Sequence, residues 1–181
     1  MSIPLRDTSG RALDHVMFGL GWSPIERRRR FGRRTTEVDL NAAAVLCRGR
    51  EPVEVVYHEQ LGSADGAVRL HGDNLTGEGG GDDEAITVDL TRLSDSITTV
   101  VFLVTSYTGR PLNRVPAACR LVDGSSGAEL HRLALSACPH TGMVVAALIR
   151  TADGWQFHPI AASVPARHPV DALPTLPSHL P

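Results

Sequence analysis

The sequence predicts an all-β protein, folded as a sandwich of two packed β-sheets. Short runs rich in Val, Ile, Leu and Thr recur along the 181 residues, and turn-forming Gly, Asp, Ser and Pro separate them. No stretch shows the sustained helical period with end caps that marks an α-helix. Several short strands joined by turns are typical of a two-sheet sandwich, and a chain of this length suits one domain.

In the first half of the chain, the expected strands differ in the spacing of their apolar residues. Residues 16–22 alternate weakly, residues 37–47 form a longer strand, and residues 53–57 form a short one. Residues 85–90 alternate cleanly, which places their apolar side chains on one face. That face is expected to turn toward a core.

In the second half, residues 97–107 are apolar on both faces, as expected of a central strand. Two hairpins follow. The turn DGSSG separates residues 115–122 from residues 129–135, and the turn ADG separates residues 143–151 from residues 155–161.

Composition divides the chain into three parts. Residues 1–14 are polar and are expected to form a loose lead-in, and residues 15–163 form the sandwich domain. Residues 164–181 are rich in proline, which interrupts sheet ladders and helix interiors. We expect this tail to be extended or disordered, with a short docked turn at residues 170–173 as the alternative.

The segment 72–84, GDNLTGEGGGDDE, is the most informative part of the chain. Glycines let the backbone bend so that several oxygens converge, and charged oxygen ligands on a flexible loop are what Ca²⁺ prefers. The segment does not match an EF-hand loop at its third, fifth and sixth positions. A solvated turn rich in Gly and Asp is the alternative.

Asp39 and Asn41 are further candidate oxygen ligands. They lie two apart in a predicted strand, so their side chains should share one face. In a sandwich, this strand and the acidic segment could meet at one end and bind one ion together. The alternative places both residues on the solvent face of a half-buried strand.

The acidic segment, extended by His71 to HGDNLTGEGGGDDE, resembles the signature of the TerD family, the calcium-binding β-sandwich proteins of tellurium resistance and general stress. Further segments agree in the family's order, namely GLGW, VDLNA, VVYHE, TVVFLVT and GWQF. The resemblance covers residues 16–160. It implies a two-sheet β-sandwich of the TerD type with long Gly/Asp-rich metal-binding loops.

The residue pattern and the resemblance together give a set of candidate ligands for one or two Ca²⁺ ions. These ligands are Asp39, Asn41, Asp73, Asn74, Gly77, Glu78, Asp82, Asp83 and Glu84.

Three positions depart from the family pattern by losing a carboxylate. Ser23, Asn41 and Gly80 stand where the family usually has aspartate. Because calcium affinity falls with the number of charged ligands, we expect weaker binding than in the family's core members, or one site where the family implies two.

The resemblance implies a non-catalytic, calcium-binding stress-response protein of the tellurite-resistance type. Such a protein would act through Ca²⁺-dependent contacts, with other stress-response or Ter-type proteins as partners. The alternative, favoured by the lost carboxylates, is a degenerate, metal-free protein-interaction module. A metal-dependent hydrolase, with Asp82, Asp83 and Glu84 holding a cation that activates water, ranks last because no general base can be named.

No established catalytic or zinc motif is present. The eight histidines form no HExxH pair, and no Cys/His set has zinc spacing. The nucleophile motif GxSxG and a phosphate-binding glycine motif are also absent. We therefore expect no enzymatic activity.

A basic cluster lies between the first two predicted strands. Such a run can bind a phosphate backbone or an anionic surface, which makes nucleic acid a weak candidate partner. It can also act as counter-charge to the acidic segment, but a solvated or disordered loop is the interpretation that we favour. The cluster consists of Arg27, Arg28, Arg29, Arg30, Arg33 and Arg34.

Cysteine usage favours the cytoplasm. Cys47, Cys119 and Cys138 lie in apolar surroundings without a CxxC pair, and an odd number does not make a disulfide framework. Buried, reduced thiols point to a reducing compartment. The sequence shows no signal peptide and no apolar run long enough to span a membrane.

Overall fold

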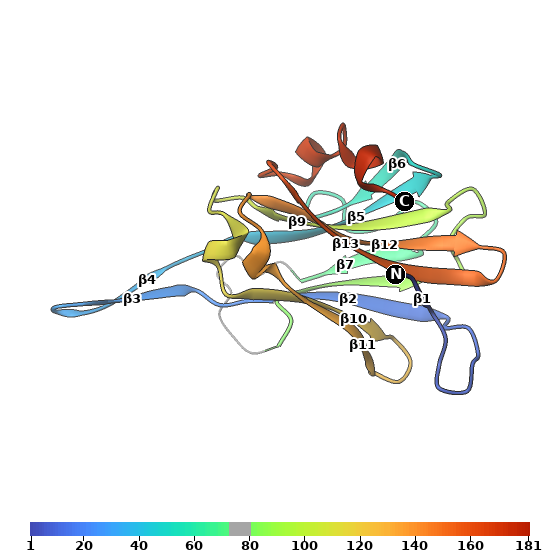
Figure 1. Cartoon of the computed structure of the whole chain (residues 1–181), viewed down its shortest axis with the longest axis horizontal. Helices are drawn as coiled ribbons and strands as arrows, with labels where there is room; N and C mark the ends of the chain where they lie inside the picture. Colours follow the sequence, from blue (N-terminus) through green and yellow to red (C-terminus); the bar gives the residue numbers. More distant parts are fainter. Residues whose placement is uncertain (73–80) are drawn as a thin grey trace.

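Two antiparallel β-sheets pack face to face in the computed structural model, which describes residues 1–72 and 81–181 (Figure 1). Within these ranges, the six-stranded sheet has the order β1 (Ile3–Pro4), β13 (Gly154–Val164), β12 (Gly142–Thr151), β9 (Thr99–Ser106), β5 (Leu40–Arg48) and β6 (Glu51–Val56). The five-stranded sheet has the order β11 (Glu129–Ala134), β10 (Ala117–Asp123), β2 (His15–Trp22), β8 (Glu84–Asp89) and β7 (Val68–His71). The predicted all-β sandwich is confirmed.

The main core lies between the two sheets. Leu40 and Ala42 of β5 point into it from the six-stranded sheet, and Phe18 and Leu20 of β2 point into it from the five-stranded sheet. The rings of Phe18 and Phe102 stack with their centroids 4.4 Å apart. This contact places the centres of the two sheets directly over each other.

The apolar pattern located most strands, with small shifts at their ends. The strand expected at residues 37–47 begins at Leu40, and the strand expected at residues 85–90 spans Glu84–Asp89. The DGSSG and ADG turns join β10 to β11 and β12 to β13, which confirms both hairpins. The short strand β7 was not predicted, because four residues are too few to show a period.

The basic cluster forms a β-hairpin, so the prediction of a loop is wrong, whereas the predicted exposure of the cluster to solvent is confirmed. β3 (Ile25–Arg29) pairs with β4 (Gly32–Thr36), and Figure 1 shows this hairpin projecting away from the sandwich. The arginines of this segment do not alternate with apolar residues, so the sequence shows no strand signal. Strands still form, because they pair through backbone N–H and C=O groups whatever the side chains are.

The proline-rich tail packs on the outer face of the six-stranded sheet (Figure 1). Two short 3-10 helices, η3 (Pro169–Ala172) and η4 (Leu176–His179), place Ala172 and Leu176 against β5, β9 and β12. The prediction of an extended or disordered tail is wrong, and the alternative of a docked turn at residues 170–173 is confirmed. Because β5 and β9 are apolar on both faces, their outer face needs a cover, and the tail supplies it.

The N-terminal lead-in is also part of the folded structure. β1 pairs with β13 through Ile3 and Phe157, and Leu5 is 3% exposed. The prediction of a loose lead-in is therefore wrong, since a two-residue strand in a polar segment leaves no pattern. The other 3-10 helices of the described residues are η1 (Leu112–Arg114) and η2 (Leu135–Ala137), and no helix in these ranges is long and apolar enough to cross a membrane.

Burial lowers the reactivity of the Cys47 and Cys119 thiols. Cys47, Cys119 and Cys138 are free and buried, as predicted. Burial raises the pKa of the Cys47 thiol from 9.0 to about 12 and raises the pKa of the Cys119 thiol as well. Because only the thiolate reacts, we expect a thiol reagent at about pH 8 to label Cys47 and Cys119 only after unfolding.

The same pKa shifts give a pH dependence of stability. The raised pKa of Cys47 in the folded state contributes stability that is fully present below pH 9.0 and is lost as the pH rises toward about 12. Urea unfolding across this alkaline range should show the decrease. Rapid labelling of the native protein by the thiol reagent would contradict this account.

Candidate metal centre

The beginnings of β8 and β5 meet at one end of the sandwich. Glu84, the first residue of β8, is 1% exposed and points between the sheets. Its Oε2 atom accepts a hydrogen bond of 2.6 Å from the backbone N–H of Ala42. The pairing of β5 with β6 starts at Ala44. Ala42 lies before that paired part of β5, and its N–H bonds to the Glu84 carboxylate instead. The predicted meeting of the acidic segment with the strand after Asp39 is confirmed.

Asp83 connects the acidic segment to β2. Its Oδ2 atom accepts a hydrogen bond of 2.8 Å from the backbone N–H of Trp22, and its own N–H donates to the Leu20 carbonyl oxygen at 2.8 Å. The indole Nε1–H of Trp22 donates to the Val38 carbonyl oxygen, also at 2.8 Å. Trp22 therefore links Asp83 to the chain just before Asp39.

Asp82 lies on the outer face of the five-stranded sheet, over Gly19. A Cβ atom on Gly19 would be 2.5 Å from Cγ of Asp82, and one on Gly21 would be 2.8 Å from the Gly81 carbonyl oxygen. Only glycine allows this close approach. Arg120, the partner of Gly19 across the β2–β10 ladder, donates to both carboxylate oxygens of Asp82 at 2.7 to 3.1 Å.

The three consecutive acidic side chains therefore have different surroundings. Glu84 lies between the sheets, Asp83 bonds to the end of β2, and Asp82 pairs with a guanidinium on the outer face. The hydrogen bonds that Arg120 donates to the Asp82 carboxylate raise the pKa of Arg120. The sequence grouped the three as ligands of one cation because Arg120 is 38 positions from Asp82 and gives no local signal.

Asp39 and Asn41 lie where the chain enters β5. β5 begins at Leu40, so Asp39 lies just outside the strand. Strand alternation therefore does not place the side chains of Asp39 and Asn41 on the same face, as was predicted. Asn41 is 4% exposed and pairs with Thr105 of β9. Because its neighbour Leu40 faces the main core, the Asn41 side chain lies on the opposite face of β5 from that core.

The oxygen donors of this end of the sandwich fit a hard cation. Asp39, Asp83 and Glu84 carry carboxylates, but among the described residues their oxygens do not form a group within 4.8 Å of one another, so these three alone do not complete a site. A carboxylate has about four lone-pair sites, so the backbone N–H bonds to Asp83 and Glu84 are compatible with binding a cation as well. Oxygen donors of this kind suit Ca²⁺. The other candidate ligands, Asp73, Asn74, Gly77 and Glu78, lie outside the described residues.

An open groove of about 680 Å³ runs along the outer face beside Asp82. Its walls come from the end of β2, the start of β10, the turn before β8 and Arg132 of β11. Ser23 lies in this groove, close in sequence to Trp22. The groove is lined by Gly21, Trp22, Ser23, Gly81, Asp82, Pro116, Ala117, Ala118, Arg120 and Arg132.

The close contact at Gly19 gives a stability prediction. Gly19→Ala places a methyl group 2.5 Å from the Asp82 carboxylate, so Asp82 must move and its pairing with Arg120 is disturbed. We expect a loss of about 1 to 3 kcal/mol in the free energy of unfolding, measured in urea. Gly62→Ala is the matched control, because its Cβ would meet only the Val68 carbonyl oxygen at 3.8 Å.

A double mutant identifies the cause of this loss. In an Asp82→Ala background, Gly19→Ala should lower the free energy of unfolding by clearly less than in the wild type, because the clashing carboxylate is gone. The effects of substitutions at contacting residues are not additive. An equal cost in both backgrounds would refute the proposed clash.

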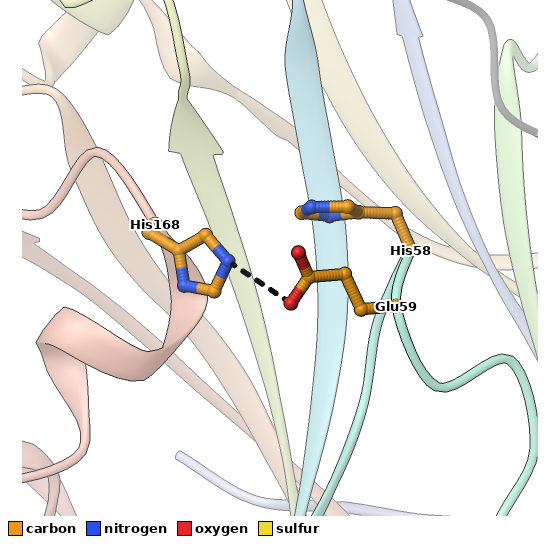
Figure 2. Close-up of side chains that lie close together, drawn as sticks. All are labelled: His58, Glu59 and His168. Atoms are coloured by element: carbon orange, nitrogen blue, oxygen red, sulfur yellow. Dashed lines mark ion pairs between the residues drawn. The ribbon is translucent and has the colours of Figure 1, made fainter.

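A second cluster of metal-ligating side chains lies where the tail meets the sheet. His58, Glu59 and His168 have ligand atoms within 4.8 Å of one another. Nε2 of His168 is 4.0 Å from Glu59 Oε2, and Figure 2 shows the two groups facing each other. Sequence reasoning missed this cluster because His168 is distant in the chain. Tyr57 joins it, with its hydroxyl donating to the same Glu59 oxygen at 3.0 Å.

Hydrogen bonding favours a docking contact here. His168 Nδ1 accepts the backbone N–H of Val170 at 3.2 Å, in the cap of η3. A neutral imidazole that accepts at Nδ1 carries its proton on Nε2, and that N–H faces Glu59. Coordination of a metal through Nε2 would move this proton to Nδ1, which could then no longer accept the Val170 N–H, so the cap would be lost. The cluster therefore fits attachment of the tail to the sheet better than metal binding.

Comparison with known proteins identifies the family. The model of the TerD domain matches residues 2–167, which is most of the chain. The chain belongs to the TerD family. The tellurium-resistance and stress-response classification of this family therefore applies, and the resemblance seen in the acidic segment is confirmed.

Curated relatives agree with this assignment. Tellurium resistance protein TerZ of Serratia marcescens is 40% identical over 152 residues, which cover 81% of this TerD-family chain and 78% of the relative. Stress response protein SCP2 of Bacillus subtilis is 31% identical over 169 residues, which cover 83% of each chain.

A solved structure of the family has the same fold. It is a homologue of telluride resistance protein (TerD) from Streptomyces coelicolor A3(2), with 25% identity and a TM-score of 0.75 over 90% of this chain and 96% of that one. The architecture derived for this chain is thus the TerD-type sandwich.

Proposed function

We propose that this TerD-family chain is a non-catalytic calcium-binding stress-response protein that contacts its partners in a Ca²⁺-dependent way. The observation that carries the proposal is the buried carboxylate of Glu84 at the end of an acidic segment. Burying a charge is costly unless it is compensated. The Ala42 N–H supplies one compensating contact, and a hard cation would supply a stronger one.

The proposed ligand set comes from two parts of the chain. Asp39, Asp83 and Glu84 are the described members, and the acidic segment adds Asp73, Asn74, Gly77 and Glu78. Asp82 is left out because Arg120 already neutralises it. Asn41 faces away from the main core, and its participation stays a prediction.

Calcium would act on the shape of this end of the sandwich. The Asp83 carboxylate holds the Trp22 backbone, and Trp22 holds Val38, so these bonds tie β2 to the entry of β5. A cation on Asp83 and Glu84 would fix both sheets to the acidic segment. That ordered surface is what we propose other stress-response or Ter-type proteins recognise.

Calorimetric titration of metal-stripped protein with CaCl₂ tests the proposal. We expect saturable heat at micromolar Ca²⁺, the range of calcium sensors. Asp83→Asn should abolish this heat and keep the fold, because the amide oxygen still accepts the Trp22 N–H. The control Asp153→Asn removes one exposed aspartate in the β12–β13 turn and should bind like the wild type.

A metal-free interaction module is the second candidate. The Asp82–Arg120 pair favours it, since an arginine of the protein provides a cation beside the acidic segment. In this case the groove next to Asp82 is the interaction surface. Absence of heat up to about 1 mM Ca²⁺, the weak end of calcium modules, would replace the calcium proposal with this one.

A further inference from the structure

The β3–β4 hairpin concentrates positive charge on a segment with no cover. This arginine arm, residues 25–36, holds six arginines and one acidic residue, Glu26, and thus carries +5. The whole chain carries −2, so the remainder carries −7. Every side chain from residue 26 to residue 35 is exposed. The charge distribution therefore directs a polyanion to the arm and away from the rest of the molecule.

Strand pairing sets like charges against each other within the arm. Arg27 lies opposite Arg34, and Arg28 lies opposite Arg33. Like charges directly across a ladder are destabilising, and an isolated two-stranded hairpin is marginally stable. The Arg33–Glu26 pair at 3.7 Å offsets only a small part of this repulsion. An external anion would remove the repulsion.

The base of the arm is anchored. The indole Nε1–H of Trp22, just before the arm, donates to the carbonyl oxygen of Val38, just after it. The Ser23 N–H also donates to the Pro116 carbonyl oxygen at 3.0 Å. These bonds hold the chain on either side of the arm to the sandwich, from which the arm projects (Figure 1).

Both faces of the arm are charged, which favours DNA over a membrane as its anionic partner. Strand alternation places Arg27, Arg29 and Arg34 on one face and Arg28 and Arg33 on the other. A membrane surface meets one face of a ribbon at a time, so it would attract the arginines of one face only. A DNA groove has phosphates on both walls, and the major groove of B-DNA is wide enough for a two-stranded β-ribbon.

We propose that the arginine arm binds duplex DNA by entering the major groove, with its arginines contacting phosphates on both walls. Such contacts are independent of base sequence. Duplex RNA fits less well, because its major groove is deep and narrow. Phe31, 94% exposed at the turn, is the apolar residue of the tip and would enter the groove first.

Fluorescence anisotropy with a labelled, mixed-sequence DNA duplex of about 20 base pairs tests this proposal, over about 50 to 200 mM NaCl. EDTA is present, so that calcium binding does not enter the result. We expect micromolar affinity at low salt and a steep loss of affinity as salt rises. The variant Arg27→Gln/Arg29→Gln/Arg34→Gln should bind at least tenfold more weakly, with the slope of log K against log salt reduced by about 2.7, the value for three lost phosphate contacts.

A matched triple variant controls for overall charge. Arg48→Gln/Arg69→Gln/Arg114→Gln removes three exposed arginines from the sandwich and should change the affinity less than twofold. The arm variant should remain folded, because glutamines remove the repulsion between paired arginines. Equal weakening by both variants would show diffuse attraction and overturn the proposal.

Two other results would also overturn it. One is no binding of the wild type at the lowest salt concentration. The other is tighter binding to vesicles of phosphatidylserine than to DNA, which would assign the arm to a membrane surface. Preference for duplex DNA over those vesicles, lost in the arm variant alone, is the expected outcome.

Discussion

Glu84→Gln is expected to eliminate calcium binding while leaving the fold intact. The amide oxygen of glutamine can still accept the Ala42 N–H, so the bond between β8 and β5 is kept. A carboxylate ligand is replaced by a neutral amide, and calcium affinity falls with ligand charge. In urea unfolding, the wild type should gain about 2.7 kcal/mol at a Ca²⁺ concentration 100 times its Kd, and the variant should gain nothing.

Glu84→Ala separates the structural role of this residue from its role in metal binding. Alanine leaves the Ala42 N–H without its acceptor in a buried site, which costs about 1 to 3 kcal/mol even without calcium. Glu84→Gln should therefore approach wild-type stability in EDTA, whereas Glu84→Ala should not. A calcium-dependent gain in the glutamine variant equal to that of the wild type would remove Glu84 from the proposed ligand set.

Leu176→Ala is the second substitution with a large expected effect. Leu176 is fully buried in the apolar layer between the tail and the outer face of the six-stranded sheet. Its truncation leaves a cavity in this layer, and we expect the free energy of unfolding to fall by about 2 to 5 kcal/mol. Urea unfolding monitored by circular dichroism measures this loss.

Leu173→Ala is the matched control for the tail. Leu173 is half-buried at the edge of the same layer. Its truncation should therefore lower the free energy of unfolding by clearly less than the truncation of Leu176. Similar small effects at both positions would mean that the tail contributes little to stability. Deleting residues 168–181 should expose the outer face and promote association, because a large apolar patch is then open to solvent.

The proline-rich tail shows the limit of composition as a guide. Proline is unfavourable in the interior of sheet ladders and helices. From this, the sequence analysis predicted that the tail is extended or disordered. The apolar residues of β5 and β9 that face outward, such as Ala43 and Val101, required a cover. Their exposure in an uncovered sheet would be unfavourable, but which segment covers them depends on the path of the chain in three dimensions.

The charged segments show a second limit. Arg27 and Arg34 were assigned to a loop because the pattern of apolar residues is the main strand signal, and an arginine-rich hairpin has none. Similarly, Asp82 was grouped with Glu84 by adjacency. Arg120 separates their roles, and only the pairing of β2 with β10 brings it to Asp82.

The sequence by itself determined the fold class, most strands, the TerD family and the acidic segment, because these depend on local residue patterns. The tertiary structure decided which carboxylate lies between the sheets, which one pairs with an arginine, and where the tail and the arginine arm lie. These depend on contacts between residues that are distant in the chain. Such contacts form only when the sheets assemble, so no local pattern of residues encodes them.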